Sequence, residues 1–334
     1  HALPLFHTHG LFVAINIMLM NGGKVILLPK FDADDVIERL PQSTVLMGVP
    51  TFYTRLLSHP QFDKDVTANM RLFVSGSAPL LAETHDAFFE RTGHKILERY
   101  GMTETCGIIT SVAADFFIDK PDSAGPAMPN FEAKCVNDLG ETVAQGEVGE
   151  LWVRGSSVIK GYINRPEATA ESITDGWLHT GDIARIDEHG FIFIVDRKKD
   201  MIVNDKGDNI APQKVEGMLT LQPEIGQAMV AGDRKPYIVG LIVPDAEWTL
   251  EWCQAQGKQF DCKQVQELPE YRNAVRAAVD RVNKDLSVVE KVRQFAFADE
   301  PFTIENEEMT PSMKIRRHKI KERYGERMDR LYRA

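Results

Sequence analysis

Cysteine is scarce in this sequence: the 334 residues contain four, at positions 106, 135, 253 and 262. No two of them form a Cys-x-x-Cys pair, and their spacing matches no zinc site. The sequence therefore predicts neither a disulfide-stapled fold nor a zinc centre. Free thiols are typical of a reducing compartment, so we expect a cytoplasmic protein.

The sequence also lacks a long hydrophobic run. Its best stretch, residues 11–20, is interrupted by Asn16 and ends at a turn-forming Asn-Gly-Gly. The stretch has about half of the ~20 apolar residues that a membrane-spanning helix needs. It predicts a buried helix that leads into a strand at residues 24–28. The chain begins at His1 without a signal-peptide pattern, a start that is typical of a piece cut from a longer sequence.

An excess of positive charge is absent as well. The chain has 49 acidic and 39 basic side chains, a net charge of −10, which argues against nucleic acid as a partner. The last 24 residues are the exception, with nine Lys/Arg against three acids. This basic C-terminal helix predicts a peripheral contact with a membrane surface.

The pattern of short apolar runs predicts an α/β protein of two domains. Buried strands at residues 44–47 and 72–74 alternate with helical segments such as 80–91, which indicates a mainly parallel sheet up to about residue 115. From about 125 to 195 the glycine-bounded strands predict a β-rich subdomain. A charged break at 196–200 then separates a small α+β domain, residues 199–334.

Two segments carry candidate ligand-binding residues, and the first of them directly follows a predicted strand, where open α/β sheets bind ligands. Small residues at 75–79 would let a flat ligand approach the backbone, although a plain strand-to-helix turn has the same composition. In the second segment, residues 99–105, Tyr100 offers a stacking surface, Thr103 a hydroxyl for phosphate and Glu104 a carboxylate for Mg²⁺. The alternative there is an ordinary helix N-cap.

Two further segments carry isolated charges. Asp182 follows a glycine and could accept both hydroxyls of a ribose, although an aspartate in a turn is common. Lys314 precedes the basic helix and could bring a point charge to a carboxylate and a phosphate. Taken alone, Lys314 is better explained as a solvated surface lysine, because most charged side chains lie on the surface.

In this order the segments resemble the adenylate-forming superfamily of acyl-CoA synthetases, luciferases and carrier-protein-loading adenylation domains. Residues 5–7 resemble its aromatic/His segment, 75–79 its adenine and acyl-pocket loop, and 100–105 its Y-G-x-T-E core, while 149–162 and 180–182 match the next two signatures. The resemblance implies that residues 1–198 are the C-terminal portion of an AMP-binding domain. It implies that residues 199–334 are a mobile small domain.

The resemblance also implies the roles of individual residues. Nucleotide-binding roles fall on Gly76, Ser77, Ala78, Pro79, Tyr100, Gly101, Asp182 and Arg197. Catalytic roles fall on Lys314, Glu104, Thr103 and His7, with Glu104 and Thr103 near Mg²⁺, and Lys199 is the implied hinge. A plain exposed linker is the alternative for Lys199. The implied reaction joins a carboxylic acid to coenzyme A through an acyl-adenylate, with ATP as the source of AMP.

The sequence departs from the family pattern in two places. The Ser/Thr/Gly-rich loop that closes on the ATP phosphates should lie upstream of His7, and no such segment is present. We therefore expect a truncated piece that binds AMP or acyl-adenylate and catalyses little pyrophosphate exchange. The residue before Lys314 is often Gly in the family and is Met313 here, as in the long-chain branch. An enzyme that loads a carrier protein and a non-catalytic AMP-binding fragment are the alternative functions.

The resemblance changes along the chain. Residues 1 to about 110 look most like malonyl-CoA synthetases, and residues from 196 onward look like long-chain fatty-acid ligases. An intermediate subfamily and a mosaic chain both fit this pattern. A malonate enzyme needs a cation in its acyl pocket, and Arg55, after a predicted strand, is the candidate. The alternative for Arg55 is a surface arginine.

Overall fold

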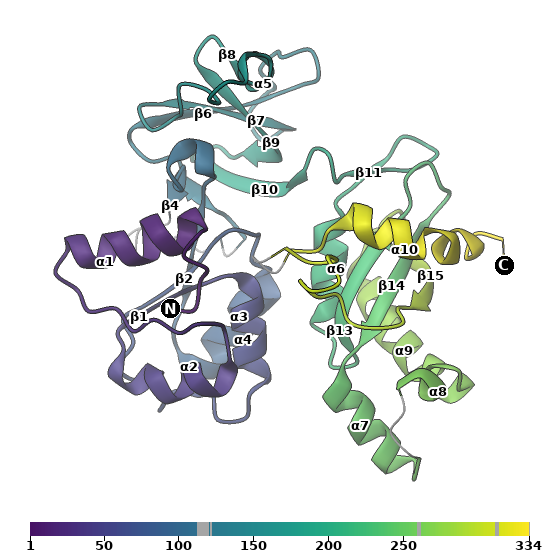
Figure 1. Cartoon of the computed structure of the whole chain (residues 1–334). Coiled ribbons are helices and arrows are strands. Elements are labelled where there is room, and N and C mark those ends of the chain that lie inside the picture. Colours follow the sequence, from purple (N-terminus) through teal and green to yellow (C-terminus); the bar gives the residue numbers. More distant parts are fainter. Residues whose placement is uncertain (112–119, 121, 259–261, 311–313, 334) are drawn as a thin grey trace. The chain divides into compact units, whose positions relative to one another are not determined.

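The computed structural model describes residues 1–111, 120, 122–258, 262–310 and 314–333. The chain forms two compact units, residues 1–198 and 199–334 (Figure 1). Each unit has its own buried core, so each is described by itself.

The first unit begins with an α/β layer around a four-stranded sheet. Its strands are β1 (Val45–Gly48), β2 (Leu72–Ser75), β3 (Ile96–Tyr100) and β4 (Thr110–Ser111), in that order. The first three are parallel, and β4 pairs antiparallel with β3. Helices pack on this sheet through a core that includes Tyr53, Phe73 and Phe88. They are α2 (Ala33–Arg39), α3 (Pro50–Ser58) and α4 (Ala82–Thr92), with the short η2 (Leu40–Gln42) after α2. The predicted strands at 44–47 and 72–74 and the helix at 80–91 are confirmed.

The N-terminal apolar run is helical but largely exposed, so the prediction of a buried helix is wrong in its burial. The run forms η1 (His9–Asn16) and α1 (Ile17–Met20). Val13 and Ala14 are buried in the core beside the sheet, whereas Met20 is 85% exposed. The predicted strand at 24–28 is not formed as a ladder strand. Its Leu28 N–H instead donates to the carbonyl of His1 at 3.0 Å.

A β-rich subdomain completes the first unit. Its antiparallel sheet has the order β5-β10-β9-β7-β6, and β8 pairs with β9. The hairpin of β9 and β10 confirms the predicted turn at residues 188–190. The bounds are β5 Gly125–Pro126, β6 Phe131–Val136, β7 Val148–Gly155, β8 Ile173–Thr174, β9 Trp177–Ile186 and β10 Phe191–Arg197, with α5 at Pro166–Ser172.

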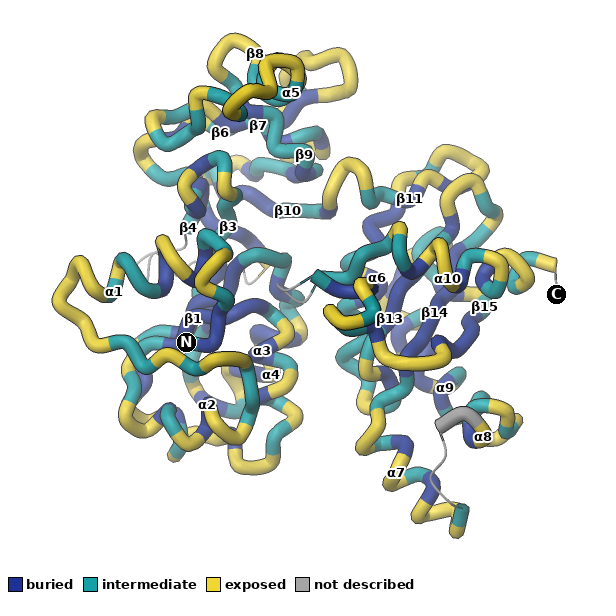
Figure 2. The backbone as a smooth tube through the Cα atoms, in the orientation of Figure 1, coloured by how far each residue is buried: buried dark blue, intermediate teal, exposed yellow. Residues whose placement is uncertain are grey.

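The second unit is built on the sheet β13-β14-β15, with β14 and β15 parallel and β13 antiparallel to β14. Six of the seven residues of β14 are buried, which Figure 2 shows as a dark strand. Alternating side chains of this strand face two cores: Ile242 packs with α6 and α9, and Leu241 packs with α10. The strands are β11 Ile202–Val203, β12 Asn209–Ile210, β13 Ile225–Ala231, β14 Ile238–Pro244 and β15 Val292–Phe297. The helices are α6 Pro212–Thr220, α7 Ala246–Ala255, α8 Cys262–Gln266, α9 Pro269–Asp285 and α10 Arg317–Arg330.

This unit confirms the predicted α+β architecture. Among the described residues, no helix combines the length and hydrophobicity that crossing a membrane requires.

Candidate functional site

The carboxyl ends of β2 and β3 bring two of the predicted segments side by side. Strand β2 ends at Ser75 and is followed by Gly76, while the parallel β3 ends at Tyr100 and is followed by Gly101. A pocket opens at this edge, as expected for a parallel sheet. It is lined by His7, Thr8, His9, Gly76, Ser77, Arg99, Gly101 and Gly107. Ala78 and Pro79 follow in the chain as half-buried residues outside this lining.

Close approach of chain segments explains the two predicted glycines. A Cβ atom on Gly76 would lie 3.2 Å from Cε1 of His9, and one on Gly101 would lie 2.4 Å from the carbonyl oxygen of Gly107. Ser77, which directly follows Gly76, has a φ of 71°. This left-handed conformation is costly for a residue with a Cβ atom. The pocket wall therefore depends on glycine and on one strained serine.

Four residues of the pocket lining were not predicted from the sequence: Thr8, His9, Arg99 and Gly107. Two of them, His9 and Arg99, have buried titratable side chains. His9 is 5% exposed, and its Nδ1 lies 3.2 Å from Oγ of Ser77. Burial, with smaller effects of Arg99 and His7, lowers the pKa of His9 to about 3, so its ring is neutral at physiological pH. The only feature of the sequence that pointed to His9 as a site residue was its place two positions after His7. Two histidines this close together are also common in ordinary turns.

Arg99 is the second such residue. One of its terminal nitrogens donates to the carbonyl of Gly107, and burial lowers its pKa to about 10, which keeps it charged at neutral pH. Its Nη1 and the Nε2 of His9 are buried and have no hydrogen-bond partner among the described residues. Unpaired buried polar nitrogens are costly, and a water molecule or a polar group of a ligand in the pocket would satisfy them.

Asp182 contacts two other predicted residues, Tyr100 and Arg197. The Tyr100 hydroxyl donates to Oδ2 of Asp182 at 2.5 Å, and Nε of Arg197 lies 3.6 Å from Oδ1. Strand pairing places Asp182 of β9 opposite Arg197 of β10. Burial and the adjacent Asp182 carboxylate raise the pKa of Tyr100 well above its usual value, so the phenol stays a donor. Asp182, which is 8% exposed, therefore has its carboxylate between the phenol of Tyr100 and the guanidinium of Arg197.

Glu104 and Thr103 lie in the short helix η3 (Thr103–Thr105), which forms the second half of the core motif at residues 100–105. The Tyr162 hydroxyl donates to Oε1 of Glu104 at 2.9 Å, and the Ile159 N–H donates to the carbonyl of Glu104 at 2.9 Å. Thr103 is exposed. Across the part of the chain that the structure describes, no group of three or more His, Cys, Asp or Glu side chains could hold a metal ion by itself. Any Mg²⁺ here would need phosphate oxygens beside Glu104.

The remaining predicted residues lie elsewhere in their units. Arg55 is exposed on α3 and does not line the pocket, while Phe52 and Tyr53 of the same helix are buried. Lys199 is exposed in the turn after β10, where the second unit begins. Lys314 belongs to the second unit, and its N–H donates to Oγ1 of Thr310 at 3.1 Å. Met313 lies outside the described residues.

Comparison with known sequences identifies the family. The family described as AMP-binding enzyme matches residues 1–163, and its companion, AMP-binding enzyme C-terminal domain, matches residues 199–334. The chain belongs to the AMP-binding enzyme family. This result confirms the resemblance to adenylate-forming acyl-CoA synthetases and the α/β fold class with a small second domain.

Individual relatives agree with this assignment. A long-chain-fatty-acid–CoA ligase of Bacillus subtilis is 39% identical over 233 residues, 69% of this chain and 41% of the relative. The ATP-bound structure of MatB from Rhodopseudomonas palustris has a TM-score of 0.76 and 36% identity, and the match covers 97% of this chain and 59% of that protein. The complex of MenE from Bacillus subtilis with ATP and magnesium has a TM-score of 0.72 and 27% identity, and the match covers 96% of this chain and 60% of that protein.

The alignments are shorter than the relatives themselves. The chain spans 41% to 48% of the length of the curated relatives that it matches. The activity, substrates and partners of the whole protein are therefore proposals.

Proposed function

We propose that the protein is an AMP-forming acyl-CoA synthetase. A carboxylate would attack the α-phosphorus of ATP to give acyl-adenylate and pyrophosphate, and the thiol of coenzyme A would then displace AMP to give the thioester. The observation that carries the proposal is the meeting of Tyr100, Asp182 and Arg197 in the unit whose pocket contains unpaired buried nitrogens. The acyl-CoA ligases among the relatives support it.

In this proposal the residues of the first unit bind the nucleotide. Asp182 would accept hydrogen bonds from the ribose hydroxyls, and Arg197 would hold that carboxylate in place. The backbone along Gly76, Ser77, Ala78 and Pro79 would face the adenine, with Tyr100 and Gly101 completing that wall. His7, on the pocket lining, would lie next to the reacting groups.

Charge neutralisation would dominate the first step, because a carboxylate and a triphosphate repel one another. We propose that Lys314 supplies a positive charge to both. We also propose that Mg²⁺ is held by Glu104 and Thr103 together with ATP phosphates, since protein sites for this ion commonly use one or two carboxylates plus phosphate oxygens. The magnesium in the MenE complex supports this choice of ion. Lys199 would be the hinge between the two half-reactions.

The proposal is tested by ATP–pyrophosphate exchange and by thioester formation, with the 334-residue chain and with the complete product of its reading frame. Carboxylate-dependent exchange at roughly 1–10³ s⁻¹, followed by transfer to coenzyme A, is the expected result for the complete product. Transfer to a carrier protein but not to coenzyme A would favour the carrier-loading alternative. AMP binding without exchange in both samples would favour a non-catalytic binding module.

We predict that Asp182→Ala weakens AMP binding by about 1.5–3 kcal/mol, since the ribose hydroxyls lose a charged acceptor. Isothermal titration calorimetry with AMP measures this change. Glu132→Ala is the matched control: Glu132 pairs with Arg154 at 2.7 Å in the same sheet, on its exposed surface. AMP affinity that stays at the wild-type value in Asp182→Ala would remove this carboxylate from the site.

The acyl substrate is proposed to be malonate or a fatty acid, and Arg55 distinguishes the two. If malonate is the substrate, the guanidinium would bind its second carboxylate bidentately. The complete protein should then prefer malonate over octanoate, and Arg55→Leu should reverse that order. Arg39→Leu, which removes a half-exposed arginine at the end of another helix of this unit, should leave the preference unchanged. A preference for octanoate that ignores Arg55→Leu would indicate a fatty-acid ligase.

The predicted membrane contact through the basic C-terminal helix is not part of this proposal. Along α10, Arg317, Arg323 and Arg327 form ion pairs within their own unit, with Glu216, Glu300 and Asp299. Charges that are paired in this way attract anionic lipids weakly. Cosedimentation with phosphatidylserine vesicles would test the contact directly.

A further inference from the structure

The backbone of Lys314 and of the two residues after it is hydrogen-bonded to residues 308–310, which precede it in the chain. The Thr310 N–H donates to the carbonyl of Lys314 at 2.8 Å, and the Arg316 N–H donates to the carbonyl of Glu308 at 2.7 Å. Between them, Met309 and Ile315 form an antiparallel bridge. The backbone of Lys314 is therefore fixed to the residues that precede it, and its position depends on how residues 299–310 are held.

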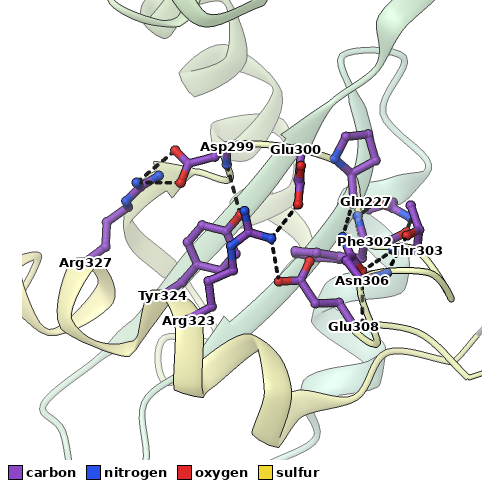
Figure 3. A network of polar contacts seen from close by, with 11 residues as sticks. Gln227, Asp299, Glu300, Phe302, Thr303, Asn306, Glu308, Arg323, Tyr324 and Arg327 are labelled. Atoms are coloured by element: carbon purple, nitrogen blue, oxygen red, sulfur yellow. Dashed lines mark hydrogen bonds and ion pairs between the residues drawn. The ribbon is translucent and has the colours of Figure 1, made fainter.

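Gln227 of β13 holds that segment from one side (Figure 3). Its Nε2 donates to the carbonyl of Phe302 at 2.9 Å, and its Oε1 accepts from the Phe302 N–H at 2.7 Å. The same Nε2 lies 3.4 Å from Sδ of Met309, which is buried in the core. One side-chain amide thus satisfies both backbone groups of Phe302, as a neighbouring strand would.

Arg323 of α10 holds the segment from the other side. Its Nη1 lies 2.6 Å from Oε1 of Glu300 and 3.3 Å from Oε1 of Glu308. The Glu308 side chain is only 2% exposed, and a buried carboxylate needs a charged partner. Arg327 pairs with Asp299 at 2.8 Å next to this contact (Figure 3). The basic face of α10 is therefore turned to the segment that leads to Lys314.

We propose that Gln227 and Arg323 are positioning residues for Lys314. They hold residues 299–310 against β13 and α10, and this segment fixes the backbone of the lysine. The proposal rests on the proposed function, in which Lys314 acts in adenylate formation. A charged group displaced by about 1 Å from a reacting centre can lose a factor of ~100 in rate, so weakening this support should slow that step selectively.

The first test is Gln227→Met, which keeps the side-chain length and removes both hydrogen bonds. In the complete protein, adenylate formation should fall by about 10–100-fold, and thioester formation from supplied acyl-adenylate should change by less than about twofold. Asn283→Leu is the matched control. Asn283 forms the same two-bond clamp with Val292, at 3.0 and 2.8 Å, away from the lysine segment in sequence. It should change neither step by more than about twofold.

Arg323→Met is the second variant and should slow the same step, with Arg323→Lys restoring most of the rate because it keeps the charge beside Glu308. An equal loss in both half-reactions, or a loss in Asn283→Leu as large as in Gln227→Met, would show a general structural effect and overturn the proposal. Wild-type adenylate formation is the control for the proposed function, and its absence would contradict that function.

Amide hydrogen exchange tests the support without any activity. In Gln227→Met the amides of Lys314 and Arg316 should exchange about 2–10-fold faster, because the loss of the hydrogen bonds to Phe302 makes local opening of this segment more favourable. In Asn283→Leu they should exchange at the wild-type rate. Unchanged exchange at both amides in Gln227→Met would overturn the positioning role, whether or not the protein forms adenylate.

Discussion

Lys314→Ala is expected to slow acyl-adenylate formation by about 10²–10³-fold while leaving thioester formation from supplied acyl-adenylate nearly unchanged. The first half-reaction brings a carboxylate to a triphosphate, and the charge of Lys314 is proposed to offset their repulsion. The second half-reaction starts from a mixed anhydride and a thiol, so the same repulsion is absent. Single-turnover measurements of the two steps separate these effects.

The matched control for this change is Lys321→Ala. Lys321 is an exposed lysine on α10 in the same unit, so its replacement removes equal charge without touching the proposed site. The converse variant is Lys199→Pro at the proposed hinge. Restricting the backbone there should impair the second half-reaction more than the first. Equal losses in both steps from Lys314→Ala would contradict a role confined to adenylation.

Local patterns in the sequence were sufficient to predict much of the fold. Apolar runs bounded by polar turns predicted β1, β2, α4 and the β9–β10 hairpin, because alternation and turn residues act over a few positions. The prediction for the N-terminal run failed because the run is apolar without a clear helical face. Hydrophobicity alone does not say which side packs, and here Val13 packs while Met20 is exposed.

The sequence motifs identified individual residues of the site, but they did not indicate which of these residues contact one another. Tyr100 and Asp182 were each singled out, but their hydrogen bond joins residues 82 positions apart, which no local pattern indicates. His9 and Arg99 were missed for the same reason: their importance comes from burial beside Ser77 and Gly107, which only the folded chain shows. A residue next to a motif, such as Arg99 beside Tyr100, cannot be identified as a pocket residue from the sequence alone.

Glu98 illustrates the same limit and leads to a prediction about stability. It is a buried carboxyl group on β3 whose Oε1 accepts the Leu80 N–H at 3.1 Å, while Oε2 has no partner among the described residues. Burial raises its pKa to about 8, although the bond from Leu80 acts in the opposite direction. In the unfolded chain a glutamate titrates near 4.5. Between these two values the folded state binds one proton more than the unfolded state.

The contribution of Glu98 to the free energy of unfolding should therefore fall as the pH rises from about 4.5 to about 8, because the unfolded chain releases this proton over that range while the folded state retains it. Glu98→Gln keeps the acceptor for Leu80 and does not titrate. The variant is expected to lose this part of the pH dependence and to exceed the wild type by roughly 4–5 kcal/mol above pH 8, at 1.36 kcal/mol per pKa unit. Urea unfolding between pH 4 and pH 9 measures the difference.

His9 supplies the opposite slope and an internal control. Its pKa is about 3 in the folded state, against an ordinary value of 6.5 for an unfolded chain, so the unfolded state binds the extra proton and stability is lost as the pH falls below 6.5. That acid-side loss should persist in Glu98→Gln, because the substitution leaves His9 buried beside Ser77. Parallel curves for wild type and Glu98→Gln from pH 5 to pH 8 would show that the carboxyl group is ionised in the folded protein. Any decrease in the free energy of unfolding toward alkaline pH would then have to come from a group other than Glu98.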